Sequence, residues 1–211
     1  MKTKIVLATR NEGKRREIER LLGDKYSLLM LNEIGFYDEI DEAGSTFEEN
    51  AIIKATTVSQ RLNMPVIAED SGLEVNALTG RPGVMSARFA GWHGDDKANN
   101  ALLLDKLRDV PAPRKARFVC VAALAYNGNM ITTRGECEGE IGFFEDGENG
   151  FGYDPLFVYK GESFGKMDVK RKNAISHRAE AFRRLSESMG DLQIFCNERI
   201  SPFGEKGIKK R

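Results

Sequence analysis

The feature that most constrains the fold of this chain is an alternation between short apolar runs and amphipathic segments. The first run, Lys4–Ala8, is bounded by polar residues, which is typical of a buried strand. The segment 14–22 then carries apolar side chains at the spacing of a helix. Further strands are expected over residues 26–31, 65–68 and 156–159, and further helices over residues 46–62, 95–107 and 176–189.

A β-hairpin in the second half of the chain decides what kind of sheet these strands can form. Two strand-like segments, residues 117–126 and 130–138, are joined across Asn127-Gly128-Asn129, and Asn-Gly is among the strongest hairpin signals. Strands linked by helices favour parallel pairing, whereas a hairpin is antiparallel. The sequence therefore predicts an α/β fold with a mixed β-sheet flanked by helices.

Length and charge limit the ligands that this chain can hold. With 211 residues, it is expected to form a single domain over residues 1–190, followed by a C-terminal extension of unknown role over residues 191–211. Lys and Arg together number 32, as do Asp and Glu, so no global basic field exists to bind a nucleic acid polymer. A local basic pocket in a neutral protein suits a small anionic ligand instead.

Cysteine usage and hydropathy bear on where the protein resides. The three cysteines, Cys120, Cys137 and Cys196, are odd in number and lack CxxC spacing, which favours a reducing compartment over a disulfide framework or a zinc site. The N-terminal apolar core is too short for a signal peptide, and no run approaches the roughly 18 apolar residues of a membrane span. We therefore expect a cytoplasmic protein that does not span a membrane.

The segment ATRNEGK, residues 8–14, connects the first strand to the first helix. A Walker loop at this place would need a glycine where Ala8 stands and Ser or Thr where Arg15 stands, so the segment is not a P-loop. The groups that still suit a triphosphate are Thr9, Asn11, Lys14 and the backbone N–H groups near Gly13. The alternative is an ordinary helix start with a solvated lysine.

Two acidic segments are suited to hold a divalent cation. Asp41 and Glu42 form the first segment. Glu69 and Asp70 form the second, and they are expected at the C-terminal end of the third strand, before Ser71. Carboxylates are hard oxygen ligands for Mg²⁺, which takes a few of them together with phosphate oxygens and water. The alternative is that these acids belong to ordinary turns, because Asp-Ser-Gly is a good turn sequence.

A glycine-hinged aromatic loop and a helix start point to a nucleotide. The loop GFGYDPLF, residues 150–157, presents aromatic rings and a carboxylate. The segment KNAISHRAEAF, residues 172–182, places four polar residues at the entry to a helix: Lys172, Ser176, His177 and Arg178. Backbone N–H groups at a helix start, together with fixed cations, form an anion site. An aromatic ring beside such a site suits a base attached to phosphates.

The role of His177 follows from its position at a helix N-terminus. The helix dipole disfavours an imidazolium there, so a neutral ring that donates to or accepts from a ligand is expected, and not a proton shuttle. No Ser/His/Asp or Cys/His triad order with supporting motifs is present, and Cys120 sits inside a strand pattern, where it is expected to be buried.

Two further segments leave alternatives open. Asn50 and Lys54 are four residues apart and share a face of their helix, so they form either part of a substrate site or an ordinary exposed pair. In residues 81–91, Pro-Gly followed by small residues indicates a tight turn feeding a strand. Arg88 in this segment is either structural or a substrate contact.

Six motifs occur in order along the chain: TRNEGK, TFEENAIIKA, AEDSGLEV, PGVMSARFAG, GFGYDPLF and ISHRAEAF. Together they closely resemble the inosine triphosphate pyrophosphatase family, over residues 3–189. The resemblance implies a long central mixed sheet, two lobes around an active-site cleft, and a homodimer. It also implies Mg²⁺-dependent hydrolysis of non-standard purine nucleoside triphosphates (ITP, dITP, XTP) to the monophosphate and pyrophosphate.

The resemblance assigns roles to the matching positions. Asp70 is expected as the general base, with Glu42, Glu69 and Asp70 holding Mg²⁺. The phosphates of the substrate are expected to contact Thr9, Arg10, Asn11, Glu12, Gly13 and Lys14. Ser71 is also expected to contact the substrate. The base is expected to contact Phe151, Gly152, Tyr153, Asp154, Lys172, His177 and Arg178. We add Lys54 to these substrate-binding candidates. The family often has a TGG-like run where this chain has Glu148-Asn149-Gly150.

Two other functions stay open at this point. One is a nucleotide phosphatase, and the other is a nucleotide-binding protein of the same fold without catalysis. Release of pyrophosphate, orthophosphate or neither distinguishes the three.

Overall fold

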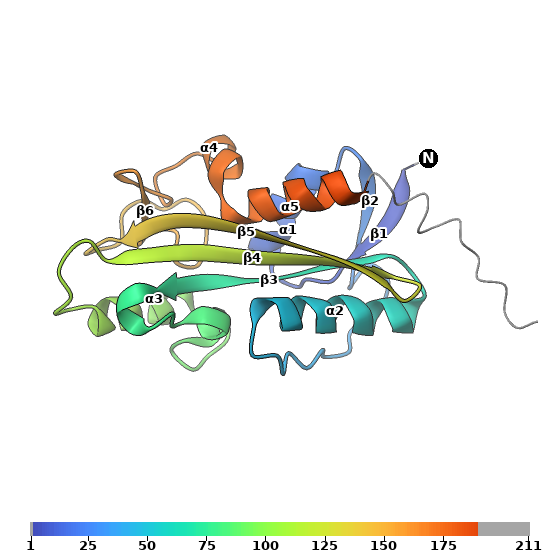
Figure 1. The fold of residues 1–211 in the computed structure, drawn as a ribbon, viewed down its shortest axis with the longest axis horizontal. Helices are drawn as coiled ribbons and strands as arrows, with labels where there is room; N and C mark the ends of the chain where they lie inside the picture. Colours follow the sequence, from blue (N-terminus) through green and yellow to red (C-terminus); the bar gives the residue numbers. More distant parts are fainter. Residues whose placement is uncertain (1, 190–211) are drawn as a thin grey trace, which may run out of the picture.

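The computed structural model describes residues 2–189, which form one seven-stranded sheet flanked by helices (Figure 1). The strands lie in the order β2-β1-β3-β4-β5-β6-β7. They are β1 (Thr3–Leu7), β2 (Tyr26–Met30), β3 (Val66–Val75), β4 (Lys115–Tyr126), β5 (Asn129–Ile141), β6 (Phe157–Tyr159) and β7 (Glu162–Ser163). The helices are α1 (Glu12–Leu22), α2 (Phe47–Leu62), α3 (Asp96–Lys106), α4 (Val169–Ile175) and α5 (His177–Ser188), with 3₁₀ helices η1 (Asn76–Leu78) and η2 (Gly83–Arg88).

The sheet is mixed, as the sequence predicts. β1 pairs in parallel with β2 and with β3, whereas the remaining neighbours, from β3 to β7, pair antiparallel. β4 and β5 form the predicted hairpin, and Asn127 and Gly128 at its turn have φ of 50° and 78°. Two consecutive positive φ angles are what a type I′ turn requires.

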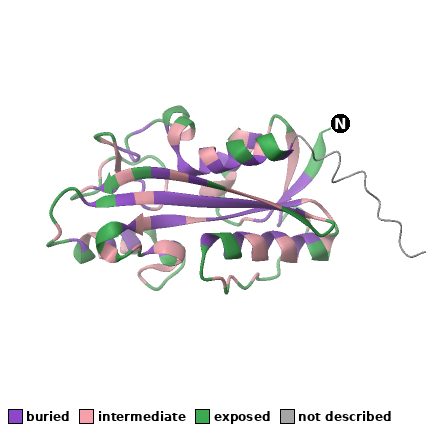
Figure 2. Ribbon diagram, viewed as in Figure 1, coloured by how far each residue is buried: buried purple, intermediate pink, exposed green. Residues whose placement is uncertain are grey.

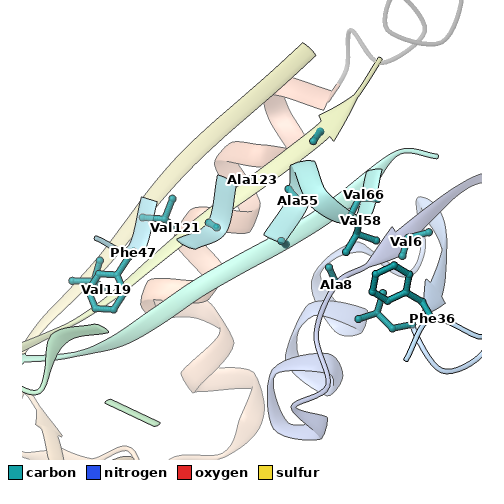
Figure 3. Close-up of a cluster of buried hydrophobic side chains, with 14 residues drawn as sticks. Val6, Ala8, Phe36, Phe47, Ala55, Val58, Val66, Val119, Val121 and Ala123 are labelled. Carbon is teal, nitrogen blue, oxygen red and sulfur yellow. The ribbon is translucent and has the colours of Figure 1, made fainter. Parts of the chain in front are cut away.

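Helix α2 covers one face of the sheet with a core of modest side chains. Phe47 lies beside Val119 and Val121 of β4, and Val58 lies beside Val66 of β3 (Figure 3). Alanines of α2, among them Ala55, let the helix approach the strands closely. The helix begins where its capping signal predicts, because Thr46 Oγ1 accepts a hydrogen bond from the backbone N–H of Glu49 at 3.1 Å.

Helix α5 covers the opposite face. Its predicted inner stripe of Ala179, Phe182, Leu185 and Met189 is buried, and the burial colours alternate along the helix as expected for one packed face (Figure 2). α1 packs beside α5 in the same core cluster. Both faces of β4 are therefore covered, one by α2 and the other by α5.

The third strand is longer than predicted. Glu69 and Asp70 were expected at its end, but β3 continues to Val75, and every residue from Val66 to Val75 pairs with β4. Ser71 is thus a ladder residue, and the turn interpretation of Asp-Ser-Gly is wrong. The long β4 supplies partners for the whole segment, and this ladder outweighs the local turn preference of the sequence.

Two further local predictions are also corrected. Residues Gly83–Arg88 form the 3₁₀ helix η2 and do not form a tight turn leading into a strand. Lys172 lies within the separate helix α4, and Ser176 both ends α4 and caps α5, accepting from the backbone N–H of Ala179 at 3.2 Å.

The C-terminal extension predicted over residues 191–211 lies outside the described residues. Among residues 2–189, no helix combines the length and the apolar character needed to cross a bilayer.

Candidate active site

The candidate residues meet where β1 stops and β3 continues. β1 ends at Leu7, and its pairing with β3 reaches only Ile67. The chain therefore leaves the sheet beside the middle of β3 and enters α1, whose N-cap is Asn11. Strand side chains alternate between the two faces of a sheet, so the adjacent residues Glu69 and Asp70 serve two different environments.

On the face covered by α2, four residues form what we call the α2-face cluster: Glu42, Asn50, Lys54 and Asp70. Lys54 Nζ lies 2.9 Å from Glu42 Oε2 and 3.4 Å from Asp70 Oδ1. Asn50 Nδ2 donates to Asp70 Oδ2 at 3.2 Å. Burial raises the pKa of Asp70, with Lys54 opposing the shift. Two carboxylates therefore share one ammonium, which leaves the cluster with an excess of negative charge.

Asn50 joins the loop before α2 to the middle of β3. Its Oδ1 accepts from the backbone N–H of Gly44 at 2.8 Å, while its amide nitrogen holds Asp70. A Cβ added at Gly44 would lie 2.6 Å from Asn50 Oδ1, so this approach needs a glycine. The loop that carries Glu42 is thereby fixed against the strand, whereas Asp41 is exposed.

Glu42 and Asp70 offer a donor set that fits Mg²⁺. Within residues 2–189, no three His, Cys, Asp or Glu side chains come close enough together to enclose a metal ion. Mg²⁺, however, is usually bound through one or two carboxylates, with water and substrate phosphates completing its octahedron. Two hard carboxylates that already converge on one cation, Lys54, suit an ion that arrives with a polyphosphate.

The other face of β3 carries a buried ion-pair cluster of three carboxylates and three cations: Glu17, Glu69, Asp154, Lys14, Lys172 and Arg178. Glu17 of α1 lies at its centre, with Lys172 Nζ at 2.8 Å and Arg178 Nη1 at 2.5 Å. Burial alone would raise the pKa of Glu17, but Arg178 and Lys172 outweigh burial and lower it. Glu17 is therefore ionised and pairs with both cations.

Sequence reasoning missed Glu17, although a signal for it exists. It stands three residues after Lys14 and next to Ile18, so it lies on the face of α1 that turns toward the core. A carboxylate at such a position needs a buried partner. The partners come from α4 and α5, more than 150 residues along the chain, and helical spacing within α1 does not identify them.

Glu69 belongs to this buried ion-pair cluster. Its Oε1 lies 2.7 Å from Lys14 Nζ, and its Oε2 lies 3.6 Å from Arg178 Nη2. The Cys120 thiol, buried as predicted, donates to Glu69 Oε2 at 3.4 Å. Burial would raise the pKa of Glu69, but Lys14 and Arg178 hold it well below the usual range. This placement argues against Glu69 as a metal ligand shared with Asp70.

The Phe151 ring lies over the buried ion-pair cluster. It is 5.1 Å from Lys172 Nζ and 5.6 Å from Arg178 Cζ. A Cβ added at Gly13 would lie 2.7 Å from the ring, so a glycine in the first turn of α1 allows the ring to lie there. Asp154 Oδ2 accepts from the backbone N–H of Phe151 at 2.8 Å and from Lys172 Nζ at 2.5 Å. The predicted aromatic loop and phosphate segment are thus in contact.

His177 is buried behind Arg178 at the start of α5. Its ring stacks on Phe118 with centroids 4.7 Å apart and planes 16° apart. Burial, with the charges of Arg178 and Lys172, lowers the pKa of His177 well below its usual value. The ring is therefore neutral, as the helix position predicts. Its Nδ1 and the Arg178 Nε are buried without a partner among the described residues.

The predicted phosphate segment divides into partly buried residues, Thr9, Gly13 and Lys14, and exposed residues, Arg10, Asn11 and Glu12. Asn11 Oδ1 caps α1 by accepting from the backbone N–H of Lys14 at 3.0 Å, and Thr9 Oγ1 accepts from the backbone N–H of Asn11 at 3.2 Å. Arg10 instead donates to a backbone oxygen at the surface, and Glu12 pairs with an arginine one turn along α1. Only part of the segment faces the site.

The remaining predicted residues are also near this site. Ser71 Oγ accepts from Arg178 Nη2 at 2.8 Å, so the residue after Asp70 contacts the buried ion-pair cluster. Gly152 and Tyr153 are held by other elements, α3 and η2. Arg88, left open by the sequence, ends η2.

Comparison with known proteins places the chain among relatives of similar length. The family model described as "Ham1 family" matches residues 5–188. Proteins named dITP/XTP pyrophosphatase from Exiguobacterium sibiricum and Desulforamulus reducens are 48% and 47% identical, over 88% and 90% of this chain and 96% and 98% of their own. The structure of a HAM1 protein from Coxiella burnetii superposes with a TM-score of 0.82 at 39% identity, covering 90% of this chain and 99% of that one.

Proposed function

Because this chain belongs to the Ham1 family, we propose that it hydrolyses non-standard purine nucleoside triphosphates, dITP and XTP among them, to the monophosphate and pyrophosphate. The observation that carries the proposal is the division at Glu69 and Asp70. One face offers two carboxylates with surplus negative charge, and the other offers a charge-balanced cluster beneath an aromatic ring. The first environment suits a metal-bound polyphosphate, and the second suits an uncharged base.

The phosphates are proposed to lie against the start of α1. The first backbone N–H groups of a helix lack intrahelical acceptors and attract anions. Lys14 is in this first turn, and its ammonium lies beside Glu69 at the edge of the buried ion-pair cluster. Lys54 lies on the other side of β3. Phosphates between the two lysines would have a cation on each side.

Glu42 and Asp70 would hold Mg²⁺, and when bound this ion neutralises charge on the phosphates and acidifies water. Asp70 is proposed as the general base. Its carboxylate takes a proton from the attacking water as the new O–P bond forms at the α-phosphorus and the bond to pyrophosphate breaks. Asn50 keeps the carboxylate oriented through its hydrogen bond.

The base is proposed to stack on Phe151 and to present its six-keto oxygen to donors near the start of α5. Two polar atoms there, His177 Nδ1 and Arg178 Nε, have no partner among the described residues. Adenine would bring an amino group to this place and leave a buried donor unpaired, at a cost of about 1–3 kcal/mol per group. A six-keto purine is therefore favoured over adenine.

The test is a panel of nucleotides scored for pyrophosphate and orthophosphate, with and without Mg²⁺. The proposal expects pyrophosphate from dITP, ITP and XTP, little from ATP, and none in the absence of the ion. Release of orthophosphate would identify a nucleotide phosphatase instead, and binding without either product would identify a non-catalytic protein.

We further propose that the protein acts as a homodimer in the cytoplasm. Light scattering on the purified chain tests the first part, and a molar mass of one chain across micromolar concentrations would contradict it. Fractionation of cells that express it tests the second part.

A further inference from the structure

The loop that carries Phe151 is held by a helix that takes no part in the chemistry described above. Asp96, in the first turn of α3, accepts from the backbone N–H of Gly152 through Oδ2 at 2.7 Å. One turn later, Asn100 Nδ2 donates to the carbonyl oxygen of the same Gly152 at 3.2 Å and to Glu145 Oε1 at 2.9 Å. Both backbone polar groups of a single glycine are thus fixed by α3.

The residue after Gly152 is held from a second direction. The Tyr153 hydroxyl donates to the carbonyl oxygen of Ser86, in η2, at 2.9 Å. η2 is itself tied to α3, because Asn99 Oδ1 accepts from the backbone N–H of Ala90 at 2.8 Å, just beyond the end of η2. α3 therefore reaches the loop directly through Asp96 and Asn100, and indirectly through η2.

These contacts matter because the aromatic ring lies next to the fixed glycine. Gly152 has φ of +63°, a left-handed conformation that few other residues adopt readily. Its N–H and C=O bonds to α3 select this conformation, and with it the direction in which the chain presents Phe151. The ring is only half-buried and would gain freedom if Gly152 were released.

We propose that Asp96 and Asn100 are positioning residues for recognition of the base. By holding both polar groups of Gly152, they fix the ring of Phe151 over the buried ion-pair cluster before ligand arrives. This inference rests on the proposed function, because it takes the purine to stack on Phe151. A ring fixed in advance loses less conformational freedom on binding, which raises affinity for the base and leaves affinity for the phosphates unchanged.

The chain offers a matched control one residue away. Asp95 caps α3 by accepting from the backbone N–H of Ala98 at 3.0 Å, whereas the neighbouring Asp96 reaches Gly152. Asp95→Ala therefore weakens the same helix without touching the loop. Asp96→Asn is the conservative rescue, because its amide oxygen can still accept from Gly152. Asn100 is buried, so its removal also endangers folding, and the test is carried by Asp96.

The experiment measures binding of two probes to each full-length variant by calorimetry: dIMP, which has a base, and inorganic tripolyphosphate, which has none. Asp96→Ala is expected to weaken dIMP about tenfold, the loss of roughly one charge-assisted hydrogen bond, and to change tripolyphosphate less than twofold. Asp96→Asn should recover most of the dIMP affinity. Asp95→Ala should lower the melting temperature by roughly 2–4 °C and leave dIMP binding intact.

Several outcomes would overturn the inference. They are equal weakening of both probes by Asp96→Ala, unchanged dIMP binding in that variant, equal weakening of dIMP by Asp95→Ala, and a wild type that does not bind dIMP. The proposed function is scored separately, by pyrophosphate released from dITP. A protein that binds dIMP through a fixed loop but releases no pyrophosphate would contradict the function and support the positioning role.

Discussion

The two faces of β3 differ in charge balance and in access to water, although they meet at consecutive residues. The α2-face cluster pairs two carboxylates with one lysine, and the Glu42 side chain is 36% exposed. The buried ion-pair cluster matches three carboxylates with three cations, and the side chains of Glu69 and Arg178 are only 1% and 3% exposed. The first cluster is unbalanced and opens to water at Glu42, although Asp70 and Lys54 are buried. The second cluster is balanced and is buried apart from Lys14.

This difference in charge balance indicates which group of a ligand each face of β3 can accept. A dry cluster with no net charge holds further charge poorly, because an uncompensated ion in the interior loses its hydration. It suits an uncharged ring with polar edges. An accessible cluster with surplus negative charge instead attracts a cation, and through the cation a polyphosphate. If this division holds, substitutions on the two faces should fail in different ways.

The largest expected effect is a loss of stability when the buried ion-pair cluster is disrupted. Arg178→Met should remove about 3–5 kcal/mol of unfolding free energy, because Glu17 and Glu69 would stay buried without their shared cation. Urea denaturation followed by circular dichroism measures it. Arg183→Met, on the exposed side of the same helix, should leave the curve close to wild type. Similar curves for both variants would remove the distinction between the faces.

The next largest expected effect is a loss of activity when the α2-face cluster is altered. Asp70→Asn should lower turnover of dITP by at least ~10²-fold while the urea curve stays near that of wild type, because it removes the proposed general base and a proposed metal ligand. The exposed neighbour of Glu42 supplies the control, since Asp41→Asn should keep most activity. A folded Asp70→Asn protein with near-normal turnover would exclude Asp70 from the mechanism.

A smaller effect sharpens the assignment of metal ligands. Glu42→Gln should raise the Mg²⁺ concentration for half-maximal activity about tenfold, the equivalent of ~1.4 kcal/mol, because one of two carboxylates is lost. Glu69→Gln should leave that concentration unchanged and reduce stability instead, because Glu69 lies with Lys14 and Arg178. A shift in the Mg²⁺ requirement of Glu69→Gln would restore Glu69 as a ligand.

The smallest expected effect is a pH dependence of the unfolding free energy that arises from His177. The pKa of His177 lies well below 6.5 in the folded protein, so the unfolded chain takes up a proton first as pH falls through that value. This contribution to the unfolding free energy is therefore nearly complete at pH 7.5 and declines as the pH falls through 6.5, by about 0.8 kcal/mol between pH 7.5 and 6.0. Urea titrations at both pH values should show this loss to be smaller in His177→Gln. Equal losses would place the proton elsewhere.

The elements of this fold that depend on local pattern could be predicted from the sequence. The cap at Thr46, the hairpin turn at Asn127-Gly128 and the inner stripe of α5 each depend on residues a few positions apart. The length of β3 could not be predicted, because its second half pairs with residues of β4 from Val75↔Ala116 to Ser71↔Cys120, more than 40 positions later in the chain. The local turn preference of Asp-Ser-Gly competes with hydrogen bonding between β3 and β4, and the periodicity of the sequence does not reveal that pairing.

The candidate site, too, could be predicted only in part. Asp70, Lys54 and Phe151 stand in motifs that the sequence singled out, and they lie within the two clusters or over them. Which face each acid serves could not be predicted, because the expectation of a strand end at Glu69 hid the alternation of the strand. Asp96 was missed for a different reason: its partner is the backbone of Gly152, and no side-chain pattern records a bond to a main-chain group.

The adjacency of Glu69 and Asp70 has a consequence for how this protein can change over time. Because every second side chain of a strand shares a face, inserting or deleting one residue in the first part of β3 would exchange the surroundings of both acids. Asp70 would enter the buried ion-pair cluster, and Glu69 would enter the α2-face cluster. Substitutions can accumulate in this strand, but changes of its length upstream of Glu69 cannot, so homologous proteins that keep this chemistry should show no gaps there.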